Sequence, residues 1–480
     1  MTNLLALSGT ELARRIRAGD VTATEVVERH IEQIEHVNPR INAVVRTRYE
    51  QARVEAKQAD ERVRSGDVTE QPLLGVPCTI KESIALRGMP NSSGMVSRAG
   101  IAASEDATVV ARIRAAGAIP LGVTNVPELT VWGATFNRVY GRTQNAYDPS
   151  RVAGGSSGGE GAVIGAGGSP FGIGTDVGGS IRTPAFCNGV FGHKPSGGLV
   201  PGTGQFPQYR GRLLRFNTTG PLARRAEDLM PLLRILAGPD GQDEGCLPYE
   251  LGDPDRVDLA SLRVLVIEDD GRRPRVARAL RHAQQRAAYA LARRGARVEP
   301  VSVAAFAQSL SIVGAAMVDA DGTSLDETLG EGARMRLGRE IVRLALRRSP
   351  FSYPPLFMLA LERLARARPR WVRRQVERGE ALRAQLDDLL GEDGVILYPS
   401  SRSVAPRHGP TAPLHFRFFG IFNVLELPAT QVPLGLSIGG LPLGVQVVAG
   451  RGRDHVTIAV ALELERALGG WVAPVRAPDS

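Results

Sequence analysis

The segment from Arg151 to Val200 constrains the fold of this chain most strongly, because it holds 16 glycines in 50 residues. It is not a flexible linker, since Val163, Phe171, Ile173 and other apolar residues are interspersed among the glycines. Glycine among apolar residues indicates tight backbone turns, positive φ angles and a close approach of the main chain to other groups. The segment therefore predicts a densely packed part of the fold rather than a connection between domains.

Strand and helix patterns alternate on both sides of this segment. A short apolar run from Leu73 to Ile80 predicts a buried strand that ends at Lys81. Helices are predicted at residues 50–65, 106–116, 272–294 and 456–468, and strands at 118–123, 262–268, 297–301, 394–398, 429–436 and 443–448. This alternation is typical of the α/β class, and we expect one large α/β domain.

The chain of 480 residues contains neither an internal repeat nor an obvious domain linker, so one domain spanning residues 1–480 is expected. Within it, two capping boxes predict N-terminal helices over residues 1–70. Residues 70–220 form the expected core, and residues 302–390 are expected to form a helical insertion or lid.

Composition and motifs exclude several classes of protein. Three cysteines in 480 residues do not build a disulfide scaffold, and no apolar run reaches the ~18 residues of a membrane-spanning helix. No basic stretch precedes the short apolar run at Leu4–Leu7, so no signal peptide is expected and a cytoplasmic location fits best. The sequence also lacks a phosphate-binding loop and metal-ligating histidine spacings.

A constellation of serine and lysine residues remains as the candidate site. It comprises Lys81, the run Gly154-Gly-Ser-Ser-Gly-Gly159 and the run Gly174-Thr-Asp-Val-Gly-Gly-Ser180. A serine hydroxyl is a poor nucleophile without a base, and a lysine serves as that base when burial lowers its pKa from ~10.4 towards ~7. The consecutive backbone N–H groups at Gly178–Ser180 carry little side-chain bulk and suit a developing oxyanion.

Two residues after the second run invite other roles. Cys187 follows the apolar Phe186 and has no base signal beside it, so we expect a core residue rather than a nucleophile. His193 is expected to be a loop histidine rather than a general base.

The serine and lysine runs resemble the amidase signature family. The family pattern is G-G-S-S-G-G followed by G-T-D-x-G-G-S-I-R, and the chain reproduces it from Gly154 to Arg182, with 24 positions between Ser156 and Ser180. The segment Thr124–Glu128 also fits this pattern. The resemblance is strong over roughly residues 70–220, and weaker but consistent at the N-terminus and over residues 390–470.

The resemblance implies a Ser–cis-Ser–Lys triad, in which Ser180 is the nucleophile and Ser156, after a cis peptide bond to Gly155, bridges it to Lys81. It implies the fold of this family, a single large α/β/α sandwich with a mixed β-sheet core and a helical insertion. It also implies hydrolysis of a carboxylic amide through an acyl-enzyme on Ser180, with no metal and no cofactor. The expected oxyanion donors are the backbone N–H groups of Val177, Gly178, Gly179 and Ser180. Residues expected to support the triad are Ser157, Thr175, Asp176 and Arg182.

A hydrophobic substrate is favoured by two further similarities. The stretch Gly158–Ile164 and the pair Phe186-Cys187 are similar to the fatty-acid-amide-hydrolase branch of the family. That branch places acyl-channel residues where this chain has Leu129, Thr130, Val131 and Trp132. Since an apolar wall suits an apolar group, we expect a hydrophobic acyl or N-acyl amide as the small-molecule substrate.

The net charge of +9 is concentrated in one segment. Residues 343–378 hold ten arginines and two acidic residues, at the position where the fatty-acid-amide-hydrolase branch carries a membrane-binding cap. Arginines beside Phe351–Leu359 and Trp371 suit a helix that lies on an anionic surface. Peripheral membrane contact through residues 343–378 and a homodimer are the candidate interactions, beside a lid that packs on its own protein. No nucleic-acid partner is expected.

Alternative activities remain open, because fold and triad do not choose the substrate. One is hydrolysis of small aliphatic or aryl amides. The other is the A-type subunit of a glutaminyl-tRNA amidotransferase, which the positive charge permits but its concentration in one segment disfavours. A catalytically inactive chain is disfavoured because all three triad residues are present.

Overall fold

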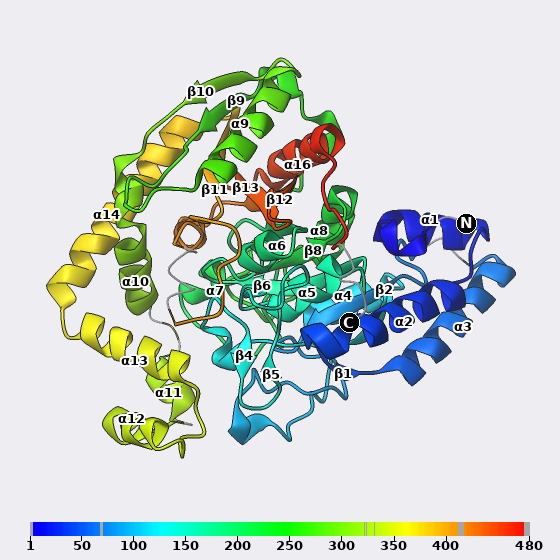
Figure 1. The fold of residues 1–480 in the computed structure, drawn as a ribbon, viewed down its shortest axis with the longest axis horizontal. Coiled ribbons are helices and arrows are strands. Elements are labelled where there is room, and N and C mark those ends of the chain that lie inside the picture. The colour runs from blue at the N-terminus through cyan, green and yellow to red at the C-terminus, as the bar shows by residue number, and fades with distance from the viewer. Residues whose placement is uncertain are drawn as a thin grey trace.

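One large β-sheet forms the frame of the molecule (Figure 1). The computed structural model describes residues 3–67, 71–320, 322, 324–330, 332–410 and 417–474. Eleven strands of this part of the chain form the sheet in the spatial order β1 (Val44–Thr47), β3 (Ile119–Thr124), β2 (Pro77–Lys81), β6 (Phe171–Asp176), β8 (Thr218–Ala223), β7 (Phe191–Lys194), β12 (Ala429–Leu436), β13 (Pro442–Ala449), β11 (Gly394–Pro399), β9 (Arg263–Val266) and β10 (Arg297–Pro300).

The sheet is mixed. Strand β2 runs parallel to both of its neighbours, β3 and β6, and β9 runs parallel to β10 and β11. The other neighbouring strands are antiparallel. The expected α/β class with a mixed sheet is therefore confirmed, and every strand predicted from an apolar run is present.

Helices lie against this sheet and at its ends. They are α1 (Gly9–Ala18), α2 (Ala23–Ile41), α3 (Tyr49–Ser65), α4 (Thr108–Ala115), α5 (Gly158–Gly165), α6 (Arg182–Cys187), α7 (Leu213–Phe216), α8 (Leu229–Leu236), α9 (Arg278–Ala292), α15 (Ile421–Val424) and α16 (Asp454–Leu468). The predicted capping boxes form, since Ser8 Oγ accepts the N–H of Glu11 at 2.9 Å and Thr22 Oγ1 accepts the N–H of Glu25 at 3.0 Å.

The prediction that residues 1–70 are helical is wrong at one place. Strand β1 lies between α2 and α3 and pairs with β3 at the edge of the sheet. Only four residues form this strand, and Val44 is its one buried member. Such a short run is too brief for an alternating pattern to appear in the sequence.

The glycine-rich segment folds into α5, β6, α6 and β7, so its strands alternate with helices in the middle of the sheet. Strands β6, β7 and β8 were not predicted, because glycine weakens the pattern of a strand. At Gly172 of β6, an added Cβ would stand 1.8 Å from Glu160 Oε2. The glycine therefore leaves the space that the Glu160 carboxyl group occupies.

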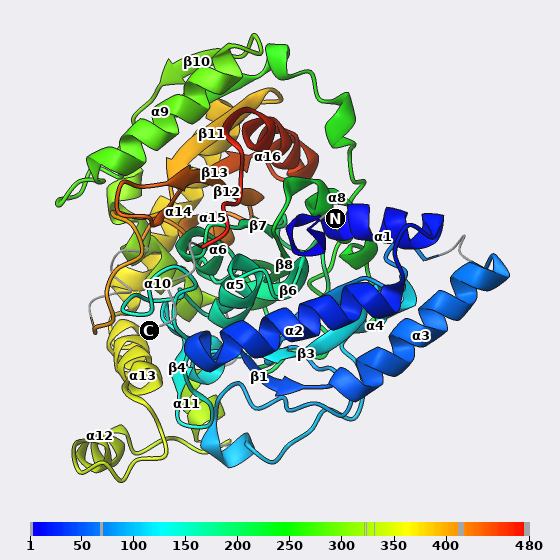
Figure 2. The ribbon, with the colours of Figure 1, turned by 45° about the vertical axis from the view of Figure 1, so that its right-hand side comes forward.

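A helical lobe (residues 309–390) connects β10 to β11. It consists of α10 (Ser309–Asp319), α11 (Leu325–Leu329), α12 (Leu337–Ala345), α13 (Tyr353–Arg366) and α14 (Pro369–Leu390). Figures 1 and 2 show that α11, α12 and α13 project from the side of the molecule opposite α1 and α3. No helix of the described ranges is long and apolar enough to cross a membrane.

Candidate active site

Lys81 is the last residue of β2, and its side chain is entirely buried. Its Nζ donates hydrogen bonds to Ser156 Oγ at 2.7 Å and to Thr175 Oγ1 at 2.6 Å. Burial lowers the pKa of Lys81 to about 7, although the charges of Asp176 and Glu160 oppose this shift. The amine is therefore neutral in a large fraction of molecules at neutral pH and is able to accept a proton.

The two predicted serine segments meet beside this lysine. The Gly155–Ser156 peptide bond is cis, and the Ser157 N–H donates to the carbonyl oxygen of Ser180 at 3.1 Å. In the part of the chain that the structure describes, the hydrogen bonds of Lys81 reach Ser156 but do not continue to the Ser180 hydroxyl. Catalytic hydrogen bonds are often loose until substrate is bound, so this geometry is compatible with a relay from Ser180 to Lys81.

The loop after β6 holds the predicted oxyanion donors. Asp176 accepts the N–H of Gly179 at 2.6 Å, so this predicted donor is already occupied. Val177, Gly178 and Ser180 remain as the candidate donors. Gly178 is exposed, and an added Cβ there would have no atom within 4 Å, which indicates open space in front of the loop.

A buried ion pair fixes this loop. Arg182 Nε and Nη2 each donate to the Asp176 carboxylate at 3.0 Å, and both side chains are fully buried. Burial alone would raise the pKa of Asp176, but the charge and hydrogen bonds of Arg182 hold it well below its usual range. Asn423 Oδ1 and Gln446 Oε1 accept from the other guanidinium N–H groups at 2.7 and 2.8 Å. The pair is fully hydrogen-bonded, which is what makes a buried pair tolerable.

Glu160 was missed as a site residue by the sequence reasoning. Its two carboxyl oxygens accept from Thr79 Oγ1 at 2.6 Å and from Thr124 Oγ1 at 2.8 Å. Thr79 lies two residues before Lys81 on β2, so their side chains share a face of the sheet. Burial raises the pKa of Glu160 to about 8. A charged residue among the small and apolar residues of α5 is the signal that points to it.

The predicted substrate wall lies under the helical lobe. Leu129 and Val131 pack in one cluster with Leu356 and Leu359 of α13. The Trp132 ring meets the edge of Tyr353 at 5.6 Å between centroids. The segment therefore faces α13, while the Trp132 carbonyl would lie 2.3 Å from a Cβ at Gly155, directly beside the serine pair.

A second group of apolar side chains surrounds the oxyanion loop and was not predicted. It comprises Val177, Tyr209, Val313 and Met317, all partly buried around one small core cluster. Val313 and Met317 belong to α10, so the helical lobe contributes to the apolar cluster that Val177 of this loop joins. Their signal in the sequence is weak, because the lobe is distant from the motifs along the chain.

The two other residues considered from sequence are both structural. Cys187 is fully buried in the core, as predicted, and burial raises the pKa of its thiol far above the ordinary value. His193 is not in a loop: it lies on β7, fully buried, with Nδ1 2.8 Å from Thr430 Oγ1 and Nε2 3.1 Å from Asp454 Oδ1. The apolar strand around it was masked by neighbouring glycines, which is why a loop was predicted.

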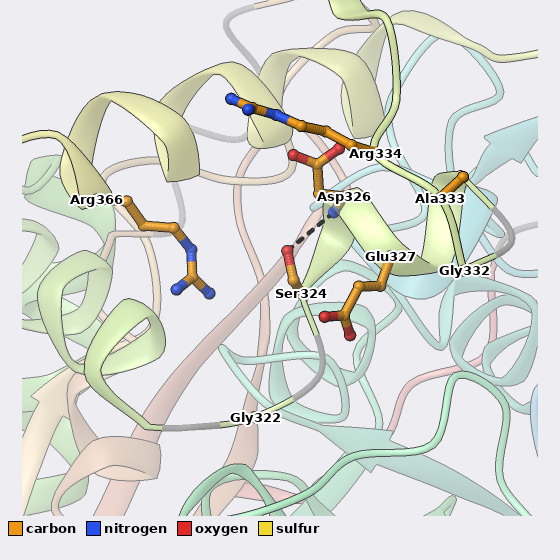
Figure 3. A pocket seen from close by; sticks show the side chains of 8 residues that line it. All are labelled: Gly322, Ser324, Asp326, Glu327, Gly332, Ala333, Arg334 and Arg366. Atoms are coloured by element: carbon orange, nitrogen blue, oxygen red, sulfur yellow. Dashed lines mark hydrogen bonds between the residues drawn. The ribbon is translucent and has the colours of Figure 1, made fainter.

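Hollows in the surface lie outside the serine and lysine cluster. One, of about 570 Å³, lies within the helical lobe, where Arg334 lies beside Asp326 and Arg366 stands on the opposite side (Figure 3). Another, of about 930 Å³, is lined by Met95 and Phe206 of the core and by residues of α11. No cluster of three or more metal-ligating side chains occurs in the described ranges.

The mixed sheet, the cis Gly155–Ser156 bond and the lysine–serine contact define an amide hydrolase of the amidase signature type. The chain belongs to this family: the family model named Amidase matches residues 25–458. Similar proteins include fatty-acid amide hydrolase 2-B of Danio rerio, 44% identical over 98% of this chain and 91% of that protein. Fatty-acid amide hydrolase 2 of Homo sapiens is 42% identical over 98% of this chain and 91% of that protein.

The fold agrees with this assignment. The solved structure of 6-aminohexanoate cyclic dimer hydrolase superposes with a TM-score of 0.80 at 27% identity, covering 98% of each chain. The chain is therefore an enzyme that hydrolyses carboxylic amides, as its resemblance implied.

Proposed function

We propose that this amidase cleaves amides of long, hydrophobic acyl groups through a covalent acyl-enzyme on Ser180. The observation that carries the catalytic part is the contact of 2.7 Å between the buried Lys81 Nζ and Ser156 Oγ. A neutral lysine in this position supplies the base that a serine nucleophile requires.

In the proposed reaction, Ser180 Oγ attacks the amide carbon and passes its proton to Ser156 Oγ, while the Ser156 proton moves to Lys81 Nζ. The carbonyl oxygen becomes an oxyanion, held by backbone N–H groups of the loop at Val177, Gly178 and Ser180. The protons then return along the same path to the leaving amine. Water, deprotonated by the same relay, releases the carboxylic acid and restores Ser180.

The acyl part of the proposal rests on the apolar surroundings of the site. One apolar surface close to the serine pair is formed by Leu129–Trp132. A second apolar surface comes from Val177, Val313 and Met317. Apolar walls with few polar groups suit an apolar ligand. The names of the similar fish protein and of the similar human protein point to the same substrate class.

A series of amides tests this proposal. Acyl chains of two to eighteen carbons on one chromogenic amine are compared by kcat/KM, because the leaving group then stays constant. The proposal expects kcat/KM to rise with chain length by about tenfold for every two methylene groups until the pocket is filled. A maximum at the shortest chain or with an aryl acyl group favours the small-amide alternative. Turnover of glutamine only with a partner subunit and charged tRNA favours the amidotransferase alternative.

We further propose that the helical lobe contacts an anionic membrane surface. Helix α13 has two apolar faces: Leu356 and Leu359 are buried inward, whereas Phe357, Leu361 and Leu364 are 44–51% exposed. The outward residues recur at helical spacing and form an apolar stripe, which we call the α13 stripe. Exposed arginines of the neighbouring α14 begin at Arg370, so apolar and basic groups lie side by side.

A further inference from the structure

One buried carboxylate joins the helical lobe to the core beside the predicted substrate wall. Glu128 begins the short 3₁₀ turn η3 (Glu128–Thr130), 1% exposed. Its Oε2 accepts both the backbone N–H of Ser352 at 2.7 Å and the Ser352 hydroxyl at 2.5 Å. These residues are 224 positions apart in the chain, so the contact is a tertiary one between core and lobe.

Ser352 is the N-cap residue of α13, and its own side chain does not cap that helix. Glu128 therefore places a carboxylate at the N-terminus of a helix of 14 residues. Unpaired N–H groups and the helix dipole both favour negative charge there. Arg138 supports the same turn, since its Nε donates to the carbonyl oxygen of Phe351 at 3.0 Å.

The Glu128 carboxylate has no other hydrogen-bond partner in the described part of the chain, because its Oε1 is buried and unpaired. The hollow of about 930 Å³ lies between core residues such as Met95 and Phe206 and the lobe residues Glu327 and Thr328. Apolar contacts of Leu356 and Leu359 also hold α13 on the core, and the Glu128 carboxylate adds a charged contact at the start of the helix.

The backbone directly after Glu128 is strained. Leu129 and Thr130 have φ angles of 54° and 59°, which non-glycine residues rarely adopt. The Leu129 N–H donates to Ser93 O at 2.8 Å, so the surrounding core also holds this turn. Since Leu129 and Val131 contact α13, the turn and the helix determine each other's position.

We propose that Glu128 is a positioning residue for substrate specificity, which fixes α13 over the wall formed by Leu129–Trp132 through its contact with Ser352. It touches no reacting atom; it acts by keeping the apolar wall closed and correctly shaped. The inference rests on the proposed function, because it assumes that long acyl chains run along this wall. A short acyl chain covers less of this wall and is therefore less sensitive to the contact.

The test compares Ser352→Ala, Ser352→Thr and Glu128→Gln with wild type at pH 8.5, where the Glu128 carboxyl is ionised because burial raises its pKa only to about 7. Ser309→Ala is the matched control, since Ser309 of α10 is also buried and its hydroxyl donates to the carbonyl oxygen of Phe306 at 2.8 Å. We expect KM for a long-chain amide to rise by about five- to tenfold in Ser352→Ala and Glu128→Gln, as for the loss of one hydrogen bond to a charged group. The kcat for an acetyl amide changes by less than about twofold. Ser352→Thr restores the wild-type KM.

A second readout keeps the inference separate from the substrate proposal. Hydrogen exchange at the first turn of α13 accelerates in Ser352→Ala and Glu128→Gln but not in Ser309→Ala. If these two variants exchange faster but wild type shows no preference for long acyl chains, the proposed substrate is contradicted and the positioning role of Glu128 is retained. Unchanged exchange in folded Ser352→Ala, or a KM that rises equally for short and long amides, overturns the inference.

Discussion

At the scale of single residues, the burial of Lys81 lowers the stability of the fold. It is fully buried in a chain in which described lysines and arginines mostly reach solvent, and its amine is hydrogen-bonded only to neutral oxygens. Burial of the charged form is the main cause of its low pKa, which is about 7. The reaction explains why such a residue is kept: a base must be neutral when Ser180 attacks.

Replacement of Lys81 by Met separates catalysis from stability. We expect kcat/KM to fall by ~10²–10⁴-fold or more, because the general base is lost. The unfolded chain binds the Lys81 proton up to ~pH 10, whereas the folded chain loses it near pH 7, so wild-type stability rises with pH between these values by up to ~1.4 kcal/mol per pH unit. The variant lacks this gain. The melting temperature of Lys81→Met therefore exceeds that of wild type most below pH 7, and the difference shrinks as the pH rises.

Thermal unfolding followed at pH 6, 8 and 9.5 checks this prediction. A difference between wild type and Lys81→Met that stays constant across these values would show that Lys81 does not titrate near neutral pH in the folded protein.

At the scale of elements, the glycines of β6 and of the following loop have opposite roles. No free space lies beside Gly172, because an added Cβ would stand 1.8 Å from Glu160 Oε2. Gly178 faces open space, with no atom within 4 Å of an added Cβ. One glycine therefore serves packing, and the other serves access to the site.

A matched pair of alanine substitutions tests this distinction. Gly172→Ala is expected to lower the free energy of unfolding by about 3 kcal/mol, since overpacking forces the buried carboxyl group to move. Gly178→Ala is expected to leave the free energy of unfolding within ~0.5 kcal/mol of wild type but to lower kcat/KM at least about tenfold, because the methyl group enters the space for substrate. Urea denaturation and steady-state kinetics measure both. Equal loss of stability in the two variants would contradict this account.

The same elements show what the sequence predicts well and what it does not. Strands such as β9 and β11 were predictable because apolar residues run without interruption through Val264–Val266 and Val395–Leu397. Strand β6 was not, since its glycines are there for Glu160 and Ser157, which lie next to it only in the folded chain. The motif spacing predicted that Lys81, Ser156 and Ser180 belong to one site. The hydrogen bond from the Gly179 N–H to Asp176 could not be predicted, because only the folded structure shows which donor is already used.

At the scale of the whole molecule, the helical lobe has an inner face and an outer face with different roles. Its inner residues, among them Leu356, Leu359 and Val313, pack over the core near the site. Its outer residues include the α13 stripe and the exposed Trp371. The length of the insertion alone did not predict which face of the lobe turns inward.

The α13 stripe gives a prediction about membranes. Replacement of Phe357, Leu361 and Leu364 by serine is expected to lower binding to phosphatidylserine-containing vesicles by at least about tenfold, because apolar area that enters the interface is lost. The kcat for a short soluble amide is expected to stay within about twofold of wild type. Tyr289→Ser on α9 is the control, because Tyr289 is 68% exposed and lies outside the lobe. Vesicle co-sedimentation measures the binding, and equal binding by the triple variant would contradict membrane contact through the stripe.

The central claim is that Ser180 is the nucleophile and that Lys81 activates it through Ser156. Intact mass after incubation with a long-chain fluorophosphonate tests this most directly, with Ser180→Ala and Lys81→Met measured beside wild type. The account predicts one adduct per wild-type chain, located on Ser180, no adduct on Ser180→Ala, and labelling slower by ~10²-fold or more on Lys81→Met. Labelling of Ser180→Ala at the wild-type rate would contradict it.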